Sequence, residues 1–270
     1  MEYVEVDGVN IPSLGLGTAR MEGEECKKAV IEGLEAGYRH VDTAQMYGNE
    51  AAVGSAIEES EVDRDEVFLV TKLDRPNMTW ERVLESVDDS LDRLKTDYID
   101  LLLIHAPSDA VPLEETVNAM NRLQESGKVN HIGVSNFSIE QLERARELSD
   151  SPIVTNQVKY NPFNSQEDML EYCADNGVML TAYSPLAVGK AVSNDTLKDI
   201  GKKYGKTPAQ VALRWLTQQR NVAAIPKAST EKHAEENIEI FDFELDEEDM
   251  ERIFELQGGL LDRLKSKIGL

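Results

Sequence analysis

The chain has few of the residues that build disulfides and metal sites, with two cysteines and four histidines in 270 residues. Cys26 and Cys173 lie far apart, inside segments with the apolar periodicity of helices. Buried free thiols are the default in a reducing compartment, so we expect neither a disulfide nor a metal role for them. No histidines pair at ligand spacing, which argues against any metal site.

Basic residues are also scarce, with 28 Lys and Arg against 51 Asp and Glu and a net charge of -23. This charge disfavours nucleic acids and anionic membranes as partners, because both are bound through clustered Lys and Arg. A solvated acidic surface selected for solubility is one explanation. A salt-rich cytoplasm, in which ions screen the self-repulsion, is the second, and it predicts a halophilic, haloarchaeal source.

Long apolar runs are missing as well. The longest, "YIDLLLIHAP" at 98–107, falls far short of the roughly 20 residues that cross a membrane. The start, "MEYVEVDGVN", has no basic region followed by an apolar stretch, so we expect a cytoplasmic protein without a secretory signal. No linker, low-complexity tract or repeat interrupts the sequence, which predicts one domain over residues 1–270.

What the sequence does contain is a regular alternation of short apolar runs and amphipathic segments. The amphipathic run at 79–97 has Val83, Val87 and Leu91 on one face, with Thr79 as a plausible N-cap. Eight candidate strands precede such segments, at 11–18, 37–44, 66–73, 98–106, 128–136, 152–160, 178–185 and 221–227. Eight βα units in a chain of this length predict an α/β fold, a (β/α)8 TIM barrel.

Three segments lie outside this alternation. Asp7-Gly8 separates two short alternating runs, which predicts an N-terminal β-hairpin that caps the bottom of the barrel. An extra amphipathic piece, 195–206, precedes a later barrel helix, and extra C-terminal helices follow the last strand.

Polar residues end most of these strands. In such barrels the active site lies at the C-terminal ends of the strands, so these side chains should converge on one rim. The strand-end residues are Asp42, Lys72, His105, Ser135, Asn136, Gln157 and Tyr183.

Each residue alone has a plain structural explanation. Asp42 could cap a turn, and Lys72 could reach solvent past the rim. His105 could be a hydrogen-bonded core histidine, and Tyr47 a packing aromatic of the loop after Asp42. Together they suggest chemistry: an ion pair of Lys72 with Asp42 would lower the pKa of Tyr47 towards working pH.

A tyrosine tuned in this way is a good general acid for a carbonyl oxygen, and a neutral His105 could donate a second hydrogen bond. His40, at the start of the stretch "HVDTAQMYGNE", is expected to face away from this site and to be structural. The glycine-rich piece at 13–20, "SLGLGTAR", lacks the third glycine of a dinucleotide fingerprint and indicates only a close backbone approach.

The order of "GLGT", "HVDTAQMYGNE", "VTK", "LLLIH", "GVSNF", "TNQV", "AYSPL" and "IPKAST" resembles the aldo-keto reductase family, in particular its prokaryotic 2,5-diketo-gluconate reductase-like members. The likeness spans residues of about 10 to 243. It implies a barrel that binds NADPH and reduces aldehydes or ketones. It also implies a catalytic set of Asp42, Lys72, His105 and the proton donor Tyr47.

The resemblance implies a cofactor site too. Ser135, Asn136 and Gln157 would contact the nicotinamide carboxamide, and Tyr183 would stack on its ring. Glu236 and Asn237 would contact adenine. The remaining residues implied beside the cofactor are Gly17, Thr18, Ser184, Leu186, Lys227, Ser229 and His233.

Two departures from the family pattern lead to predictions. His233 stands where many relatives have arginine, and Ala228 where serine is usual after Lys227, so NADH is expected to be a usable second cofactor. Ala19 and Ala106 stand where many relatives place aromatics, and the loop at 106–115 and the tail at 256–270 are short. This predicts a wide substrate pocket for small aldehydes, dicarbonyls or keto sugars.

Two other classes remain open. One is a Schiff-base aldolase or isomerase that uses Lys72. The other is a regulatory subunit of the same fold that senses a nucleotide. We expect a small-molecule substrate, no nucleic acid or membrane partner, and a monomer.

Overall fold

The computed structural model describes residues 1–257 and begins with the predicted hairpin. β1 (Tyr3–Val6) and β2 (Val9–Pro12) pair antiparallel, with Val6 opposite Val9. Asp7 and Gly8 form the turn with φ of 48° and 80°, as a two-residue hairpin turn requires.

Eight parallel strands form the second sheet, in the order β10-β9-β8-β7-β6-β5-β4-β3. A parallel bridge between Leu14 and Ala224 joins its two ends and closes the barrel. The strands are β3 (Leu16–Gly17), β4 (His40–Asp42), β5 (Phe68–Leu73), β6 (Ile99–Ile104), β7 (Val129–Ser135), β8 (Ile153–Lys159), β9 (Met179–Tyr183) and β10 (Val222–Ile225).

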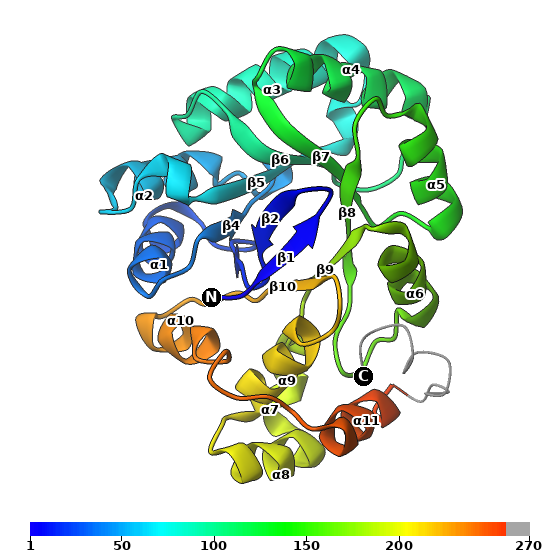
Figure 1. The fold of residues 1–270 in the computed structure, drawn as a ribbon. Coiled ribbons are helices and arrows are strands. Elements are labelled where there is room, and N and C mark those ends of the chain that lie inside the picture. The colour runs from blue at the N-terminus through cyan, green and yellow to red at the C-terminus, as the bar shows by residue number, and fades with distance from the viewer. Residues whose placement is uncertain (258–270) are drawn as a thin grey trace.

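The helices surround these strands (Figure 1). Eight follow the eight strands: α1 (Gly23–Glu35), α2 (Glu50–Glu59), α3 (Trp80–Leu94), α4 (Leu113–Glu125), α5 (Ile139–Leu148), α6 (Glu167–Asn176), α9 (Pro208–Thr217) and α10 (Glu231–Ile238). Within residues 1–257, three helices are additional: α7 (Lys190–Ser193), α8 (Asp195–Tyr204) and α11 (Glu247–Glu255). The shorter 3-10 helices are η1 (Gln45–Tyr47), η2 (Arg64–Glu66), η3 (Arg75–Asn77) and η4 (Ala187–Gly189).

The predicted fold is therefore confirmed, including the extra segment before α9. Of the extra C-terminal helices, α11 is described and packs against α8. The sequence also predicted a short tail at 256–270. Residues 258–270 of that tail lie outside the described residues. Within residues 1–257, no helix combines the length and the apolar character that crossing a bilayer requires.

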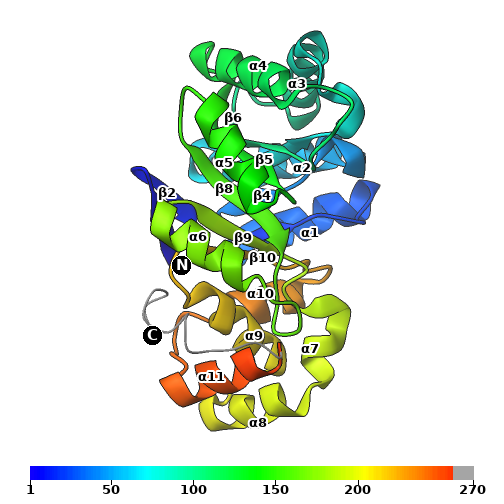
Figure 2. The same ribbon diagram turned by 90° about the vertical axis from the view of Figure 1, so that its right-hand side faces the viewer.

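The hairpin caps one end of the barrel. In Figure 1 it lies across the centre of the ring of strands, and in Figure 2 it stands at one side of the molecule. Val4, Val6 and Ile11 of the hairpin pack against barrel residues such as Leu101 and Met179 in one buried cluster. This apolar burial stabilises the hairpin on the barrel, although its two strands are only four residues long.

The two cysteines match the sequence prediction, and the start of α3 differs from it in one detail. Cys26 and Cys173 are free and buried as expected, and burial raises the pKa of Cys26 to about 11. Thr79 is the N-cap of α3, but its side chain makes no capping hydrogen bond. The first N–H of α3, that of Trp80, instead donates to Glu115 of α4 at 2.9 Å. A side chain of the neighbouring helix therefore binds a backbone donor that has no partner within α3.

Candidate active site

The polar strand-end residues meet at one rim because their strands are parallel neighbours in the sheet. Asp42 of β4 pairs with Val70 of β5, two residues before Lys72. Leu73, the residue after Lys72, pairs with Ile104 of β6, the residue before His105. Ser135 of β7 lies opposite Gln157 of β8. This is the C-terminal end of every barrel strand, where barrels of this kind carry their chemistry.

The ion pair of Asp42 and Lys72 forms the buried centre of this rim. Lys72 Nζ donates to Asp42 Oδ1 at 2.6 Å and to the Thr43 carbonyl at 2.8 Å, and its side chain is fully buried. Gln157 Nε2 donates to the other oxygen of Asp42 at 2.8 Å. Both charges therefore have partners, which a buried ion pair needs if it is to persist.

Tyr47 is held over this pair by the short loop after β4. It ends η1, and Gly48 follows in the left-handed region with φ of 66°, which turns the chain into α2. Lys72 Nζ lies 5.1 Å from the centre of the Tyr47 ring. The five-residue offset between Asp42 and Tyr47 thus folds the phenol back over the ion pair.

The predicted lowering of the Tyr47 pKa is wrong for this structure. The pKa of Tyr47 is raised above its ordinary value, first by burial, while the nearby Lys72 ammonium lowers it and Asp42 raises it. Sequence reasoning counted the ammonium but not the burial of the phenol or the carboxylate that offsets the ammonium. A raised pKa keeps Tyr47 protonated at neutral pH, the form that a proton donor needs.

His105 lies beside Tyr47, with the two rings edge to face and their centres 5.7 Å apart. Burial is the first cause that lowers the His105 pKa, and Lys72 is the second, so the imidazole is neutral. Its Nδ1 is buried without a hydrogen-bond partner among residues 1–257. An unpartnered buried lone pair costs less than an unpartnered N–H, which favours a proton on Nε2.

Hydrogen bonds join the amide and hydroxyl groups of the neighbouring strand ends. The Ser135 hydroxyl donates to the Gln157 carbonyl at 2.8 Å and accepts from Asn136 Nδ2 at 3.0 Å. Tyr183 donates through its hydroxyl to Asn136 Oδ1 at 2.9 Å. Asn136 has a φ of 61°, a conformation that asparagine tolerates. These four residues therefore form one connected polar surface.

The backbone at the end of β3 approaches β10 closely, as predicted. A Cβ on Gly17 would come within 2.8 Å of the Ile225 carbonyl oxygen, so only glycine fits there. Thr18 is fully buried, and its hydroxyl donates to the Asp42 carbonyl at 3.0 Å. Ala19 and Ala106, the predicted substrate-pocket residues, are partly buried beside Thr18 and His105 in the chain.

Three residues that the resemblance implies beside the cofactor lie at the start of α10 or just before it: Lys227, Ser229 and His233. Thr230 caps the helix by accepting from the His233 N–H at 3.2 Å, and Ser229 and His233 are exposed. Lys227 Nζ donates to the Arg20 carbonyl at 3.1 Å, which places it next to the end of β3. Of the two residues assigned to adenine, Asn237 is 5% exposed and Glu236 is partly exposed. Ser184 and Leu186, after β9, are also partly exposed.

His40 does not face away from the site. Side chains two residues apart in a strand share a face, so His40 lies on the same side of β4 as Asp42. Its Nδ1 is 3.1 Å from the Pro12 carbonyl oxygen, and a Cβ on Gly15 would lie 2.7 Å from its ring. His40 is thus a buried structural residue below Asp42, where the hairpin meets the barrel.

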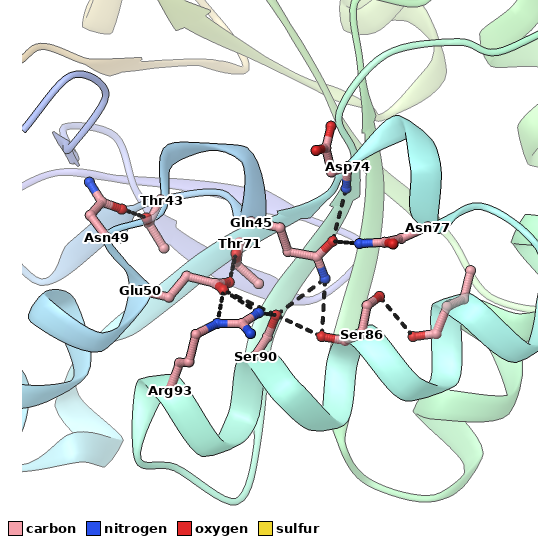
Figure 3. A network of polar contacts seen from close by, with 11 residues as sticks. Thr43, Gln45, Asn49, Glu50, Thr71, Asp74, Asn77, Ser86, Ser90 and Arg93 are labelled. Atoms are coloured by element: carbon pink, nitrogen blue, oxygen red, sulfur yellow. Dashed lines mark hydrogen bonds and ion pairs between the residues drawn. The ribbon is translucent and has the colours of Figure 1, made fainter.

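Sequence reasoning missed a polar network behind the Tyr47 loop (Figure 3). Glu50 is 1% exposed, and Gln45 is fully hydrogen-bonded through its amide. Both residues stand in the stretch "HVDTAQMYGNE", and the signal was a glutamate at the first position of a helix that packs on the barrel.

Comparison with known proteins identifies the relatives of this chain. The sequence model of the aldo/keto reductase family matches residues 13–257. A glyoxal reductase from Bacillus subtilis (strain 168) is 40% identical over 248 residues, which cover 92% of this chain and 89% of that protein. A methylglyoxal reductase, DkgB, from Escherichia coli O157:H7 is 38% identical over 263 residues, 96% of this chain and 97% of that protein.

A solved structure agrees with these relatives. The crystal structure of a putative 2,5-diketo-D-gluconic acid reductase B superposes with a TM-score of 0.94 at 46% identity, and the match covers 97% of this chain and 94% of that one.

Proposed function

The chain belongs to the aldo/keto reductase family, and we propose that it reduces small aldehydes, dicarbonyls or keto sugars to alcohols with Tyr47 as proton donor. The observation that carries this proposal is the placement of the Tyr47 phenol, with the Lys72–Asp42 pair beneath it and His105 beside it. The relatives named for glyoxal and methylglyoxal reduction support dicarbonyls as substrates.

The family uses nicotinamide cofactors, and the groups present on the rim suit one. Asn136 and Gln157 carry amides and Ser135 a hydroxyl, which together can match the donors and acceptors of a carboxamide. Lys227, Ser229 and the first turn of α10 offer a cation, a hydroxyl and helix N–H groups to a phosphate. A bound reduced nicotinamide would supply hydride to the carbonyl carbon.

The chain's own residues account for the proton. Tyr47 would donate its phenolic proton to the carbonyl oxygen as negative charge develops there. Lys72 stabilises the tyrosinate left behind, and Asp42 holds Lys72 in place. His105 would donate a second hydrogen bond from Nε2 and so orient the carbonyl.

We propose NADPH as the preferred cofactor and NADH as a usable one. Lys227 and Ser229 support recognition of a 2′-phosphate. His233 and the buried Ala228 weaken it, because an imidazole and a methyl group cannot replace a guanidinium fork and a hydroxyl.

One assay tests both activity and cofactor. Purified protein is mixed with NADPH or NADH and a panel of aldehydes, dicarbonyls and keto sugars in high salt, and cofactor oxidation is followed at 340 nm. We expect turnover with several small carbonyls and with both nucleotides. His233→Arg should raise kcat/KM for NADPH about tenfold or more and leave NADH unchanged, since one charge-assisted contact contributes about 1.5–3 kcal/mol.

The same assay separates the alternatives. Absence of NADH turnover where NADPH saturates would contradict the relaxed preference, and one substrate preferred by several orders of magnitude would contradict the wide pocket. Stoichiometric NADPH binding without turnover would indicate the regulatory class. A Schiff base at Lys72 is disfavoured, because its ammonium is fully buried and donates to two acceptors.

We further propose that the acid surplus makes the protein halophilic. At 0.1 M salt the Debye length is about 10 Å, and at 1 M it is about 3 Å, so salt screens repulsion among exposed carboxylates. The melting temperature should therefore rise as NaCl increases from 0.1 to about 2 M, with equal osmolality of sucrose as the control. A melting temperature that stays constant or falls with added NaCl would contradict a halophilic origin.

One domain over residues 1–270, a monomeric state and a cytoplasmic location remain predictions.

A further inference from the structure

The loop that carries Tyr47 is braced from behind by a buried carboxylate. Glu50 opens α2 three residues after Tyr47, and its side chain is 1% exposed. Its Oε1 accepts from the Thr71 hydroxyl at 2.6 Å, and its Oε2 accepts from Arg93 Nε at 2.8 Å. Arg93 is 43% exposed and lies on the last turn of α3, so a surface cation neutralises a buried anion.

The amide of Gln45 holds the other side of the loop. Its Oε1 accepts from the Asp74 N–H at 2.9 Å and from Asn77 Nδ2 at 3.0 Å. Its Nε2 donates to the Ser86 carbonyl and to the Ser90 hydroxyl, both at 3.2 Å. All four partners lie either on the loop that follows β5 or on α3. The Gln45 amide therefore connects η1 to both of these segments.

Ser90 joins the two anchors into one network. Its hydroxyl oxygen accepts from Gln45 and from Arg93, and the hydroxyl lies 3.3 Å from Glu50 Oε2. Figure 3 shows this chain of contacts running along α3 beneath the loop. Because Gln45, Glu50 and Ser90 each have partners on at least two elements, the loop cannot shift without breaking several hydrogen bonds.

The network also reaches the strand that carries Lys72. Thr71 directly precedes Lys72 on β5, and strand alternation sends its side chain to the outer face while Lys72 points inward. Asp74, whose N–H binds Gln45, follows Lys72 by two residues. The same contacts therefore fix the backbone on both sides of Tyr47 and on both sides of Lys72.

We propose that Glu50, together with Gln45, is a positioning residue that sets the placement of Tyr47 relative to Lys72. The proposal rests on the proposed function, because it assigns Glu50 an effect that passes through the Tyr47 proton donor. Misplacement of a reacting group by about 1 Å can lower a rate about 100-fold, so a brace at this point has a direct effect on turnover.

The test uses Thr71→Val, which removes the hydroxyl while keeping the strand residue's shape, and Glu50→Gln, which removes the charge. Each is expected to lower kcat for methylglyoxal by about 10- to 100-fold. KM and the NADPH dissociation constant, measured by fluorescence titration, should stay near those of the unmodified protein. Normal NADPH binding also shows that the variant has folded.

Asp249→Asn is the matched control. Asp249 is also 1% exposed, lies in the first turn of α11 and pairs with the part-exposed Lys203 and Arg252. Its replacement should lower the melting temperature and leave kcat unchanged. Equal losses of kcat in Asp249→Asn and Glu50→Gln would reduce the role of Glu50 to general stability and overturn the proposal.

A double-mutant cycle with Tyr47→Phe separates this proposal from the proposed function. If Glu50 acts through Tyr47, Glu50→Gln should lower kcat much less in the Tyr47→Phe protein than in the unmodified one. The same fold-loss in both backgrounds would overturn the positioning role. Full activity of Tyr47→Phe itself would instead overturn the proposed function. A third outcome is also possible: Tyr47→Phe is inactive, while Thr71→Val and Glu50→Gln keep a normal kcat. That result would overturn the positioning role and leave the proposed function in place.

Discussion

Tyr47→Phe is expected to lower kcat for carbonyl reduction by about 10²- to 10⁴-fold and to leave NADPH binding nearly unchanged. Phenylalanine keeps the ring that packs against His105 and Lys72 and removes only the hydroxyl. A group that acts mainly in the transition state affects kcat and kcat/KM alike, with little change in ground-state binding. Steady-state kinetics with methylglyoxal and a fluorescence titration with NADPH measure the two quantities.

Tyr160→Phe provides the control for that substitution. Tyr160 is also buried and donates to Gln219 Oε1 at 2.8 Å, but its ring packs against Trp215 of α9 instead of against the Lys72–Asp42 pair. Loss of the hydroxyl should lower the free energy of unfolding by about 1–3 kcal/mol, since Gln219 Oε1 loses its donor, and should leave kcat unchanged. Equal loss of turnover and of nucleotide binding in Tyr47→Phe would contradict the role of Tyr47 as proton donor.

Lys72→Met should have a large effect on stability as well as on activity. It leaves Asp42 as a buried carboxylate without its cation, and breaking a buried pair in this way costs about 3–5 kcal/mol. Urea unfolding, followed by circular dichroism at constant high salt, measures the change in free energy. Reduction of methylglyoxal should be abolished, because Tyr47 loses the charge that stabilises its tyrosinate.

The double variant Asp42→Asn with Lys72→Met tests that explanation. It removes both charges, so it should recover most of the lost stability while activity stays absent. A double variant that is no more stable than Lys72→Met would show that the loss came from packing of the lysine stem. Recovery of activity would mean that the charge at Lys72 is not needed for proton donation.

Much of the fold followed from local pattern. Seven of the eight strands were predicted to within three residues at each end, because each is a short apolar run between amphipathic helices, and Asp7-Gly8 marked the hairpin. The first, predicted at 11–18, is only Leu16–Gly17, because Ile11 and Pro12 pair within the hairpin as part of β2. Polar residues that end parallel strands must share a rim, so the meeting of Asp42, Lys72 and His105 was predictable from strand order alone.

Other features depended on contacts between distant residues. Gln157 binds Asp42 across 115 positions of the chain, and Glu50 binds Arg93 across 43. Sequence periodicity shows which face of an element is apolar, but it does not show which polar side chains from two elements will meet. The hydrogen bonds of the network around Glu50 and Gln45 could therefore not be predicted from the sequence.

The sequence by itself determined the barrel, its capping hairpin and the set of groups at the rim, because these follow from periodicity and chain order. Only the tertiary structure decided the direction in which the Tyr47 pKa shifts, the inward position of His40 and the polar network behind the loop. The physical reason is that a pKa or a buried hydrogen bond depends on solvent exclusion and on neighbouring charges. Both quantities exist only after distant segments have packed together.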